Sequence, residues 1–391
     1  MNYRKDRQGR DISILGYGCM RFTKTAGIID LAKAEEEVMR AIEGGVNYFD
    51  TAYIYPGSED ALGRILENNG ARDKVYIATK LPQYLMKNLN TAEKIFNEEL
   101  KRLRTDHIDY YLMHMLADLK EWNKLKALGI EDWLADKKAS GRIGSVGFSY
   151  HGDTEDFIEI LDAYDWDFAQ IQYNYLDEDS QAGRRGLMAC ARRGIPVIIM
   201  EPLRGGRLVN LPKAALKPLE DSGFGWSAAE LALRWLWDQP QVTCVLSGMN
   251  SDAMIDENMR IASSVEAGSF GDREKAVTDE IVSVIRSREK VGCTGCRYCM
   301  PCPHGVDIPG NFFYYNQVYT EGRISALSDF GKAMGMHKTP GFASQCVECG
   351  ACEKHCPQHI HIIDELKRAD RVLRPLPVKA GLAVIRKAMG R

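Results

Sequence analysis

The sequence predicts an α/β protein: a (β/α)8 barrel followed by a small, mainly α-helical domain that holds most of the cysteines. Three observations lead to this prediction. Short apolar or β-branched runs alternate with longer amphipathic segments, which is typical of a parallel sheet. Eight such strand–helix units fit in roughly 250 residues, the usual length of this barrel. The alternation stops near residue 265, and two dense cysteine runs follow.

The strand candidates are short and are bounded by turn residues. A hairpin over residues 3–15, with its turn in RQGR, is expected to precede them. In chain order they are LGYGCM (15–20), VNYFDTA (46–52), VYIATK (75–80), HIDYYLMH (107–114), IGSVGFS (143–149), FAQIQYN (168–174), PVIIME (196–201) and VTCVLSG (242–248). Segments between them, such as 34–45 and 91–105, have apolar residues at helical spacing. A doubly wound open sheet is the competing fold, but it would need a Gly-rich fingerprint after its first strand, and GYGCMRFTKTAG is a poor match.

The composition is that of an ordinary globular protein. Of the 391 residues, 45% are apolar and 27% are charged. The formal net charge of −3 gives no whole-chain footprint of nucleic-acid binding, so none is expected. The N-terminus lacks an apolar core of signal-peptide length, and the longest apolar runs are far shorter than the ~20 residues that span a bilayer. We therefore expect a cytoplasmic protein without membrane association.

Polar side chains stand at the ends of three successive strand candidates. Asp50, Lys80 and His114 occupy these ends, and Tyr55 follows in the loop after Asp50. Chemistry in a (β/α)8 barrel takes place at the C-terminal ends of the strands. These four residues are therefore the candidate catalytic residues. An acid, a phenol, a cation and an imidazole together suit the reduction of a carbonyl.

Such a reduction needs a proton donor for the developing alkoxide, and Tyr55 is the candidate. Tyrosine titrates near ~10, so lowering its pKa by two or three units takes roughly 3–4 kcal/mol. An ammonium ~4 Å away supplies about 4 kcal/mol at an effective dielectric constant of 20. We therefore expect Lys80 to lower the pKa of Tyr55, Asp50 to keep Lys80 charged, and His114 to orient the substrate oxygen.

Over about residues 10–262, the motifs DTAYIYPGSEDALG, ATK and DYYLMH resemble the aldo-keto reductase family, (β/α)8-barrel oxidoreductases that use a nicotinamide cofactor. The resemblance implies that the family's catalytic tetrad falls on the four residues above. It also implies that NAD or NADP is contacted by Ser149, Gln172, Gly205, Gly206, Ser247, Gly248, Asn250, Glu257 and Asn258. Two positions depart from the family pattern. Met200 stands where most members have an aromatic residue that stacks on the nicotinamide, and Met249 with Asn250 stands where NADP-preferring members have a Lys or Arg.

Eight of the eleven cysteines fall in two runs. The second run, CVECGACEKHCP, has the C-x2-C-x2-C-x3-C-P spacing of bacterial two-cluster ferredoxins, and the first, CTGCRYCMPCP, is one residue shorter before its last cysteine. Zinc is the alternative, but it needs thiolates in two pairs rather than two triplets with two distal cysteines. The resemblance implies two [4Fe–4S] clusters, one on Cys293, Cys296, Cys299 and Cys356 and the other on Cys346, Cys349, Cys352 and Cys302. Cys19, Cys190 and Cys244 are expected to be ordinary buried thiols.

The whole chain resembles aldo-keto reductases with a C-terminal ferredoxin-like domain. We expect residues 1–265 to form the barrel, 266–292 a helical connector, 293–362 the ferredoxin-like domain and 363–391 a basic helical tail. The tail is expected to be a solvated helix that packs on the protein's own acidic surface. The alternative is that it steers an acidic partner.

Three functions remain open. The first is an NAD(P)-dependent oxidoreductase that reduces a small-molecule carbonyl or oxidises an alcohol, with clusters that are structural or serve a redox partner protein. The second is an electron-transfer enzyme in which the clusters feed a flavin or a substrate in the barrel, because nicotinamide delivers a hydride whereas a cluster passes single electrons. The third is a non-enzymatic redox sensor, against which the intact tetrad argues.

Overall fold

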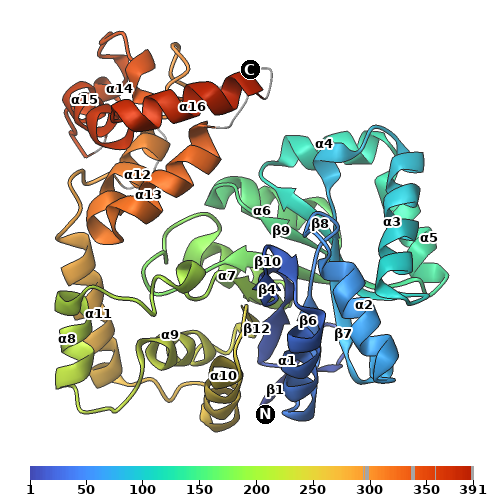
Figure 1. Ribbon diagram of the computed structural model, residues 1–391. Coiled ribbons are helices and arrows are strands. Elements are labelled where there is room, and N and C mark those ends of the chain that lie inside the picture. The colour runs from blue at the N-terminus through green and yellow to red at the C-terminus, as the bar shows by residue number, and fades with distance from the viewer. Residues whose placement is uncertain (294, 296–298, 336–339, 357, 389–391) are drawn as a thin grey trace. The chain divides into compact units, whose positions relative to one another are not determined.

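The computed structural model describes residues 1–293, 295, 299–335, 340–356 and 358–388 (Figure 1). The described chain divides into two compact units. The first consists of Met1–Val209 and Trp226–Lys275, and the second of Asn210–Gly225 and Ala276–Arg391. The segment Asn210–Gly225 therefore belongs to the second unit although both of its flanks belong to the first.

The first unit contains a closed barrel of eight parallel strands, which confirms the predicted fold. The order around the barrel is β10-β11-β12-β3-β6-β7-β8-β9, so the strands follow one another in chain order and β12 closes on β3. The strands are β3 (Leu15–Gly18), β6 (Tyr48–Asp50), β7 (Tyr76–Leu81), β8 (Ile108–Leu116), β9 (Ile143–Tyr150), β10 (Phe168–Gln172), β11 (Val197–Met200) and β12 (Val242–Ser247). Each of them overlaps one of the predicted runs.

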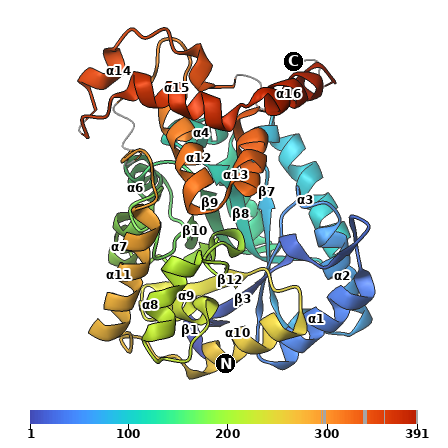
Figure 2. The same cartoon turned by 60° about the vertical axis from the view of Figure 1, so that its left-hand side comes forward.

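Helices connect successive strands on the outside of the barrel (Figures 1 and 2). They are α1 (Leu31–Glu43), α2 (Ser58–Asn68), α3 (Leu89–Leu103), α4 (Leu119–Ala127), α5 (Ile130–Ala139), α6 (Thr154–Ala163), α7 (Gly183–Arg192), α9 (Ala228–Trp237) and α10 (Asp252–Ser264). Capping side chains set several of their starts. Asp30 accepts the N–H of Lys33 before α1, and Asn88 accepts the N–H of Thr91 before α3. Shorter elements are the strands β4 (Lys24–Thr25) and β5 (Ile28–Ile29) and the 3-10 turns η1 (Cys19–Arg21), η2 (Arg72–Lys74), η3 (Gln83–Leu85) and η4 (Arg204–Gly206).

The barrel interior is built in layers by the alternation of strand side chains. One buried layer includes Tyr48, Ala78, Leu112 and Phe168. Two positions further along the same four strands stand Asp50, Lys80, His114 and Gln170. Because residues i and i+2 of a strand face the same side of the sheet, the alternation that fills the core also carries these polar side chains to the layer nearer the C-terminal rim.

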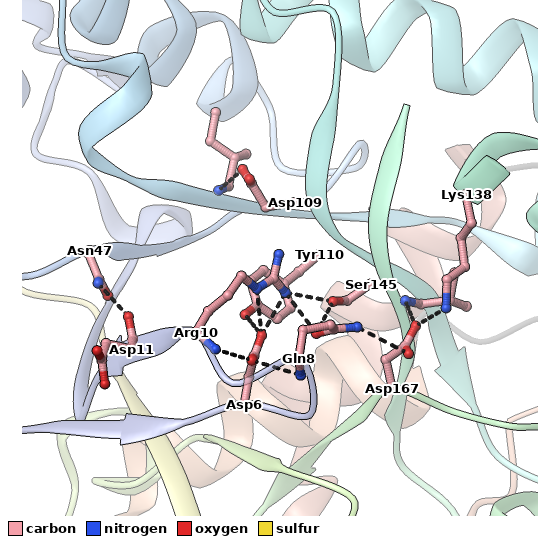
Figure 3. A network of polar contacts seen from close by, with 12 residues as sticks. Asp6, Gln8, Arg10, Asp11, Asn47, Asp109, Tyr110, Lys138, Ser145 and Asp167 are labelled. Atoms are coloured by element: carbon pink, nitrogen blue, oxygen red, sulfur yellow. Dashed lines mark hydrogen bonds and ion pairs between the residues drawn. The ribbon is translucent and has the colours of Figure 1, made fainter. Parts of the chain in front are cut away.

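The hairpin predicted before the barrel is confirmed: β1 (Tyr3–Lys5) and β2 (Asp11–Ser13) pair in antiparallel fashion. This hairpin covers the base of the barrel. Figure 3 shows Asp6 beside Arg10 and Tyr110. The carboxylate of Asp6 accepts hydrogen bonds from the Tyr110 hydroxyl at 2.6 Å and from Arg10 Nε at 2.7 Å. Arg10 also donates to Ser145 Oγ at 2.7 Å. Since Tyr110 and Ser145 lie near the starts of β8 and β9, this network ties the hairpin to the end of the barrel opposite the polar layer.

The second unit is helical, in agreement with the predicted fold class. Its helices are α8 (Lys213–Asp221), most of α11 (Asp272–Arg286), α12 (Ile308–Thr320), α13 (Arg323–Phe330), α14 (Ala351–Lys354), α15 (Ile362–Leu373) and α16 (Leu376–Ala388), with short turns η5 (Gly331–Gly335) and η6 (Ala343–Gln345). Helix α8 lies beside α11 in both views (Figures 1 and 2). The core of this unit joins Phe312 of α12, Phe330 of α13 and Leu366 of α15.

Ion pairs hold the basic C-terminal helices. Lys367 lies 2.7 Å from Glu348, and Arg374, which directly follows α15, lies 2.9 Å from Asp370 of that helix. In the part of the chain that the structure describes, no helix is both long enough and apolar enough to cross a membrane.

The three cysteines outside the two runs are fully buried, as predicted: Cys19, Cys190 and Cys244 are each 0% exposed.

Candidate active site and cysteine cavity

A buried ion pair lies at the C-terminal rim of the barrel. Asp50 ends β6, and Lys80 lies on the neighbouring strand β7. Lys80 Nζ lies 2.6 Å from Asp50 Oδ1 and donates a second hydrogen bond of 2.6 Å to the Thr51 carbonyl oxygen. Lys80 is 1% exposed and Asp50 is 5% exposed. Because a buried charge without a partner is costly, the carboxylate of Asp50 is what allows an ammonium group to remain at this position.

Gln170 of β10 holds the other oxygen of the same carboxylate. Its Nε2 donates to Asp50 Oδ2 at 2.8 Å, and the residue is 1% exposed. The sequence analysis missed this residue. The signal that could have found it is the strand alternation, which places Gln170 two positions after the buried Phe168 on the inward face of FAQIQ.

The loop between β6 and α2 brings Tyr55 over this ion pair. The Tyr55 N–H donates to the Ala52 carbonyl at 3.0 Å, and the Ser58 N–H donates to the Tyr55 carbonyl at 3.1 Å, so the loop is pinned on both sides. The Tyr55 ring centroid lies 5.4 Å from Lys80 Nζ. It lies 6.1 Å from the ring centroid of His114, with the two rings nearly perpendicular at 83°. The four predicted tetrad residues are therefore brought together in one place.

Burial, rather than the ammonium group, dominates the pKa of Tyr55. Burial raises this pKa above its ordinary value of 10.0, the Lys80 charge lowers it, and the Asp50 and Glu201 carboxylates raise it. The expected net decrease is therefore wrong, because the sequence-based argument counted the cation and omitted desolvation. Burial also opposes the charge on Lys80, but Asp50 and Tyr55 outweigh it and raise the pKa of Lys80 above 10.5. At neutral pH the site thus holds a neutral phenol beside an ammonium ion.

His114 is held as a neutral imidazole. It lies at an irregularity of β8, where the register with β9 shifts between Met113 and Leu116. Such a bulge re-aims a strand-end side chain, and His114 is 5% exposed. Burial lowers its pKa from 6.5 to about 3, and the positive charge of Lys80 acts in the same direction. Its buried Nδ1 has no hydrogen-bond partner among the described residues, which is unusual for a buried polar atom.

Two predicted cofactor contacts already have protein partners. Ser149 Oγ accepts the backbone N–H of Met115 at 2.9 Å, which supports the bulge in β8. Gln172 Nε2 donates to Asp177 Oδ2 at 2.9 Å. Arg204 also reaches that oxygen, at 3.0 Å. Ser149 keeps a hydroxyl proton that it can donate, and Gln172 keeps its carbonyl oxygen.

The loops after β11 and β12 hold the remaining predicted contacts. Gly205 and Gly206 have φ angles of 70° and 94°, which favour glycine at both positions. Ser247 and Asn258 are joined directly, with Asn258 Nδ2 donating to Ser247 Oγ at 3.0 Å. Gly248 and Asn250 lie in the short segment between β12 and α10, where Asn250 is exposed. Glu257 is half-buried on α10. The structure therefore gathers these residues along two neighbouring strand ends of one rim.

Cysteines of both runs line a cavity of about 280 Å³. The thiol-bearing residues that line it are Cys299, Cys302, Cys346, Cys349 and Cys352. All of them except Cys299 belong to the set of four predicted to hold one cluster. Cys293 and Cys356 do not line this cavity, and Cys296 lies outside the described residues.

Apolar side chains and backbone amides complete the cavity. Val306, Ile308, Ile363 and Leu366 contribute to its lining. The N–H of Glu348 donates to Cys346 Sγ at 3.4 Å. An apolar lining and N–H donors to thiolate sulfur fit the way proteins hold iron–sulfur clusters. Among the described residues, no group of three His, Cys, Asp or Glu side chains is close enough to share a single metal ion.

Comparisons with known proteins agree with both parts of this architecture. The Aldo/keto reductase family matches residues 14–267, and the 4Fe-4S dicluster domain matches residues 292–361. An aldo-keto reductase of Mycobacterium sp. (strain MCS) is 30% identical over 230 residues, which are 58% of this chain and 74% of that protein. The NAD/NADP-dependent indole-3-acetaldehyde reductase of Schizosaccharomyces pombe is 27% identical over 57% of this chain and 77% of that protein. An aldo-keto reductase from Klebsiella pneumoniae, solved in complex with NADPH, has the same fold with a TM-score of 0.57 at 21% identity, over 72% of this chain and 95% of that one.

The family match spans all eight barrel strands, from β3 to β12. The dicluster match spans both cysteine runs, including the residues around the cavity. The chain is therefore an oxidoreductase that belongs to the aldo/keto reductase family and carries a C-terminal 4Fe-4S dicluster domain.

Proposed function

We propose that the barrel reduces a small-molecule carbonyl, or oxidises the corresponding alcohol, with Tyr55 as the proton donor and NAD(P)H as the source of hydride. The observation that carries this proposal is the convergence of Tyr55 and His114 on a buried Lys80–Asp50 ion pair. Each member of the tetrad has a distinct task in such a reaction, and the geometry described above is compatible with all four tasks.

Tyr55 serves as a general acid because it is neutral. An acid must hold its proton until the transition state, and burial raises the pKa of Tyr55 so that the phenol stays protonated at neutral pH. The alkoxide that develops on the substrate is far more basic than a phenolate, so the transfer remains favourable. Lys80 then lies 5.4 Å from the ring and stabilises the phenolate that forms.

His114 orients the substrate oxygen. A neutral imidazole can donate one N–H while its other nitrogen accepts, and the low pKa of His114 keeps it neutral throughout the physiological range. Gln170 and Lys80 fix the Asp50 carboxylate between them, so the charge arrangement beneath Tyr55 is rigid.

A nicotinamide dinucleotide is the proposed cofactor, and when bound it supplies hydride to the carbonyl carbon. The named relatives support this choice, because one is NAD/NADP-dependent and another was solved with NADPH. Residues that would hold the dinucleotide are Ser149, Gln172, Gly205, Gly206, Ser247, Gly248, Asn250, Glu257 and Asn258. The unpartnered His114 Nδ1 and the glycines at positive φ fit an occupant of this rim.

Two [4Fe–4S] clusters are proposed for the dicluster domain, where they provide one-electron chemistry or structural support. Cys302, Cys346, Cys349 and Cys352 would hold the cluster of the described cavity. Cys293, Cys296, Cys299 and Cys356 would hold the other. A redox partner protein is the proposed source or acceptor of electrons, and the cytoplasmic location stays a prediction.

The test uses full-length protein purified without oxygen and a panel of small aldehydes and ketones. Tyr55→Phe is expected to lower kcat by at least ~100-fold, the usual contribution of a general acid. Tyr53→Phe is the matched control, because it removes a hydroxyl from the same loop, where the Tyr53 ring packs under Arg102. Unchanged turnover of every substrate by Tyr55→Phe would refute the proposed proton donor. Reduction of the clusters by NAD(P)H alone, seen by visible and EPR spectroscopy, would replace the simple hydride mechanism with an internal electron relay.

A further inference from the structure

Arg21 occupies the same rim as the proposed dinucleotide site, although no sequence motif drew attention to it. It ends the turn η1 (Cys19–Arg21), which directly follows β3. Strand β3 pairs with β12, and β12 pairs with β11. Arg21 therefore stands beside the two strand ends whose loops carry Gly205 and Gly248.

The side chain of Arg21 lies across both glycine loops. A Cβ atom added to Gly248 would lie 2.9 Å from Arg21 Cδ and 3.2 Å from Arg21 Cβ. A Cβ atom added to Gly205 would lie 3.2 Å from Arg21 Nη2. The aliphatic stem of Arg21 thus rests on Gly248, and the guanidinium reaches Gly205. The absence of a side chain at Gly248 gives the arginine its path.

The charge of Arg21 is available to a ligand. Arg21 is exposed, and its side chain makes no hydrogen bond or ion pair with any described residue. Other basic residues around α10 are paired with carboxylates. Arg260 lies 2.5 Å from Glu230, and Arg40 makes two hydrogen bonds to Asp256.

We propose that Arg21 binds the pyrophosphate of the dinucleotide, an inference that rests on the proposed function. A guanidinium presents N–H groups in a planar fork that matches phosphate oxygens. The contacts with Gly205 and Gly248 place that fork beside the two loops that follow β11 and β12. Because NADH and NADPH share the pyrophosphate, Arg21 contributes equally to the binding of both.

The test measures the dissociation constants of NADH and NADPH by fluorescence titration of the full chain. Arg21→Ala is expected to weaken both by a similar factor of roughly ten, equivalent to about 1.4 kcal/mol. Arg21→Lys is expected to recover part of the loss, because it restores the charge without the fork. Arg260→Ala is the matched control, since it removes an arginine of α10 that is already paired with Glu230. The affinities of this variant should equal those of the unmodified protein.

A double-mutant cycle tests the role given to Gly248. Gly248→Ala displaces the stem of Arg21, so part of its effect on nucleotide binding acts through Arg21. The double variant with Arg21→Ala is therefore expected to lose less binding free energy than the sum of the two single losses. Strict additivity would contradict the proposed path of the side chain.

The remaining outcomes are separable. Unchanged affinities of Arg21→Ala overturn the inference while leaving the proposed function intact. A loss confined to NADPH also overturns it, because Arg21 would then bind the 2′-phosphate. Failure of the unmodified protein to bind either nucleotide removes the proposed function and this inference together.

Discussion

Asp50→Asn is the substitution whose consequence follows most directly from the structure. The change preserves shape but removes the charge, and it replaces one carboxylate oxygen by an NH2 group. Both oxygens of Asp50 now accept hydrogen bonds, from Lys80 at 2.6 Å and from Gln170 at 2.8 Å. Whichever way the new amide turns, its NH2 group faces a donor. Lys80, which is 1% exposed, is left without a counter-charge.

The expected loss is large because the pair is buried. At 2.6 Å the attraction is about 6 kcal/mol for an effective dielectric constant of ~20. Removing one partner of a buried pair typically costs about 3–5 kcal/mol, and we expect that loss in the free energy of unfolding. The ion pair raises the pKa of Lys80 above 10.5, so its stabilisation is complete below pH 10.5 and is lost as pH rises through the folded value. Asp50→Asn lowers the pKa of Lys80 relative to the unmodified protein, so the alkaline limb of the kcat profile moves to lower pH.

Urea unfolding at pH 7, followed by circular dichroism on cluster-loaded protein, measures the stability change. Asp256→Asn is the matched control. It makes the same substitution in an ion pair of similar length, 2.7 Å to Arg40, whose side chains are 46% and 49% exposed. An exposed pair contributes little, so this variant should unfold almost like the original. Equal behaviour of the two variants, with the alkaline limb unmoved, would refute the assignment of the buried pair as the electrostatic base of the site.

Three further predictions concern other parts of the molecule. His114→Gln should lose less stability at acid pH than the original chain, as measured by urea unfolding at a series of pH values. Burial lowers the pKa of His114 from 6.5 to about 3, so across that interval this residue lowers the original chain's free energy of unfolding by about 1.4 kcal/mol for each pH unit. A parallel pH dependence of the two proteins would contradict the buried, neutral imidazole. Tyr110→Phe should lower the free energy of unfolding by about 1–2 kcal/mol, because it removes the hydrogen bond from the Tyr110 hydroxyl to the buried Asp6. Nucleotide affinity should stay unchanged, since Tyr110 lies at the base of the barrel. Cys302→Ala should lose about half of the bound iron in a colorimetric assay, as expected if one of two clusters is lost. Cys190→Ala, which removes a buried thiol of α7, should retain all of the iron. Full iron content in Cys302→Ala would remove this residue from the ligand set.

The strands could be predicted from the sequence, and so could the meeting of four polar side chains at one end of the barrel, because their signals are local. Each barrel strand is a short apolar run, and Asp50, Lys80 and His114 stand at the ends of such runs. Gln170 and Arg21 were missed because their importance depends on which strand closes next to which. Gln170 reaches Asp50 across the barrel, 120 positions away in the chain. No window of sequence contains that contact.

The sign of the Tyr55 pKa shift was also beyond the sequence. The charge of Lys80 is visible in the letters, and its lowering effect on the phenol was anticipated correctly. Desolvation is a property of the packed loop and of the rim around it, and it is the larger influence. A charge can be read from one residue, whereas burial depends on all of its neighbours.

The interleaving of the two units limits how this chain can be dissected. Helix α8 is encoded within the barrel sequence, yet its segment clusters with the residues after 275. A fragment that stops at residue 275 would retain α8, including its buried Ala215 and Leu219, while discarding most of α11 beside it. Such a fragment would therefore keep one segment of the second unit and lose the rest of that unit. Isolating the cysteine-bearing portion with a single cut would, conversely, leave α8 behind.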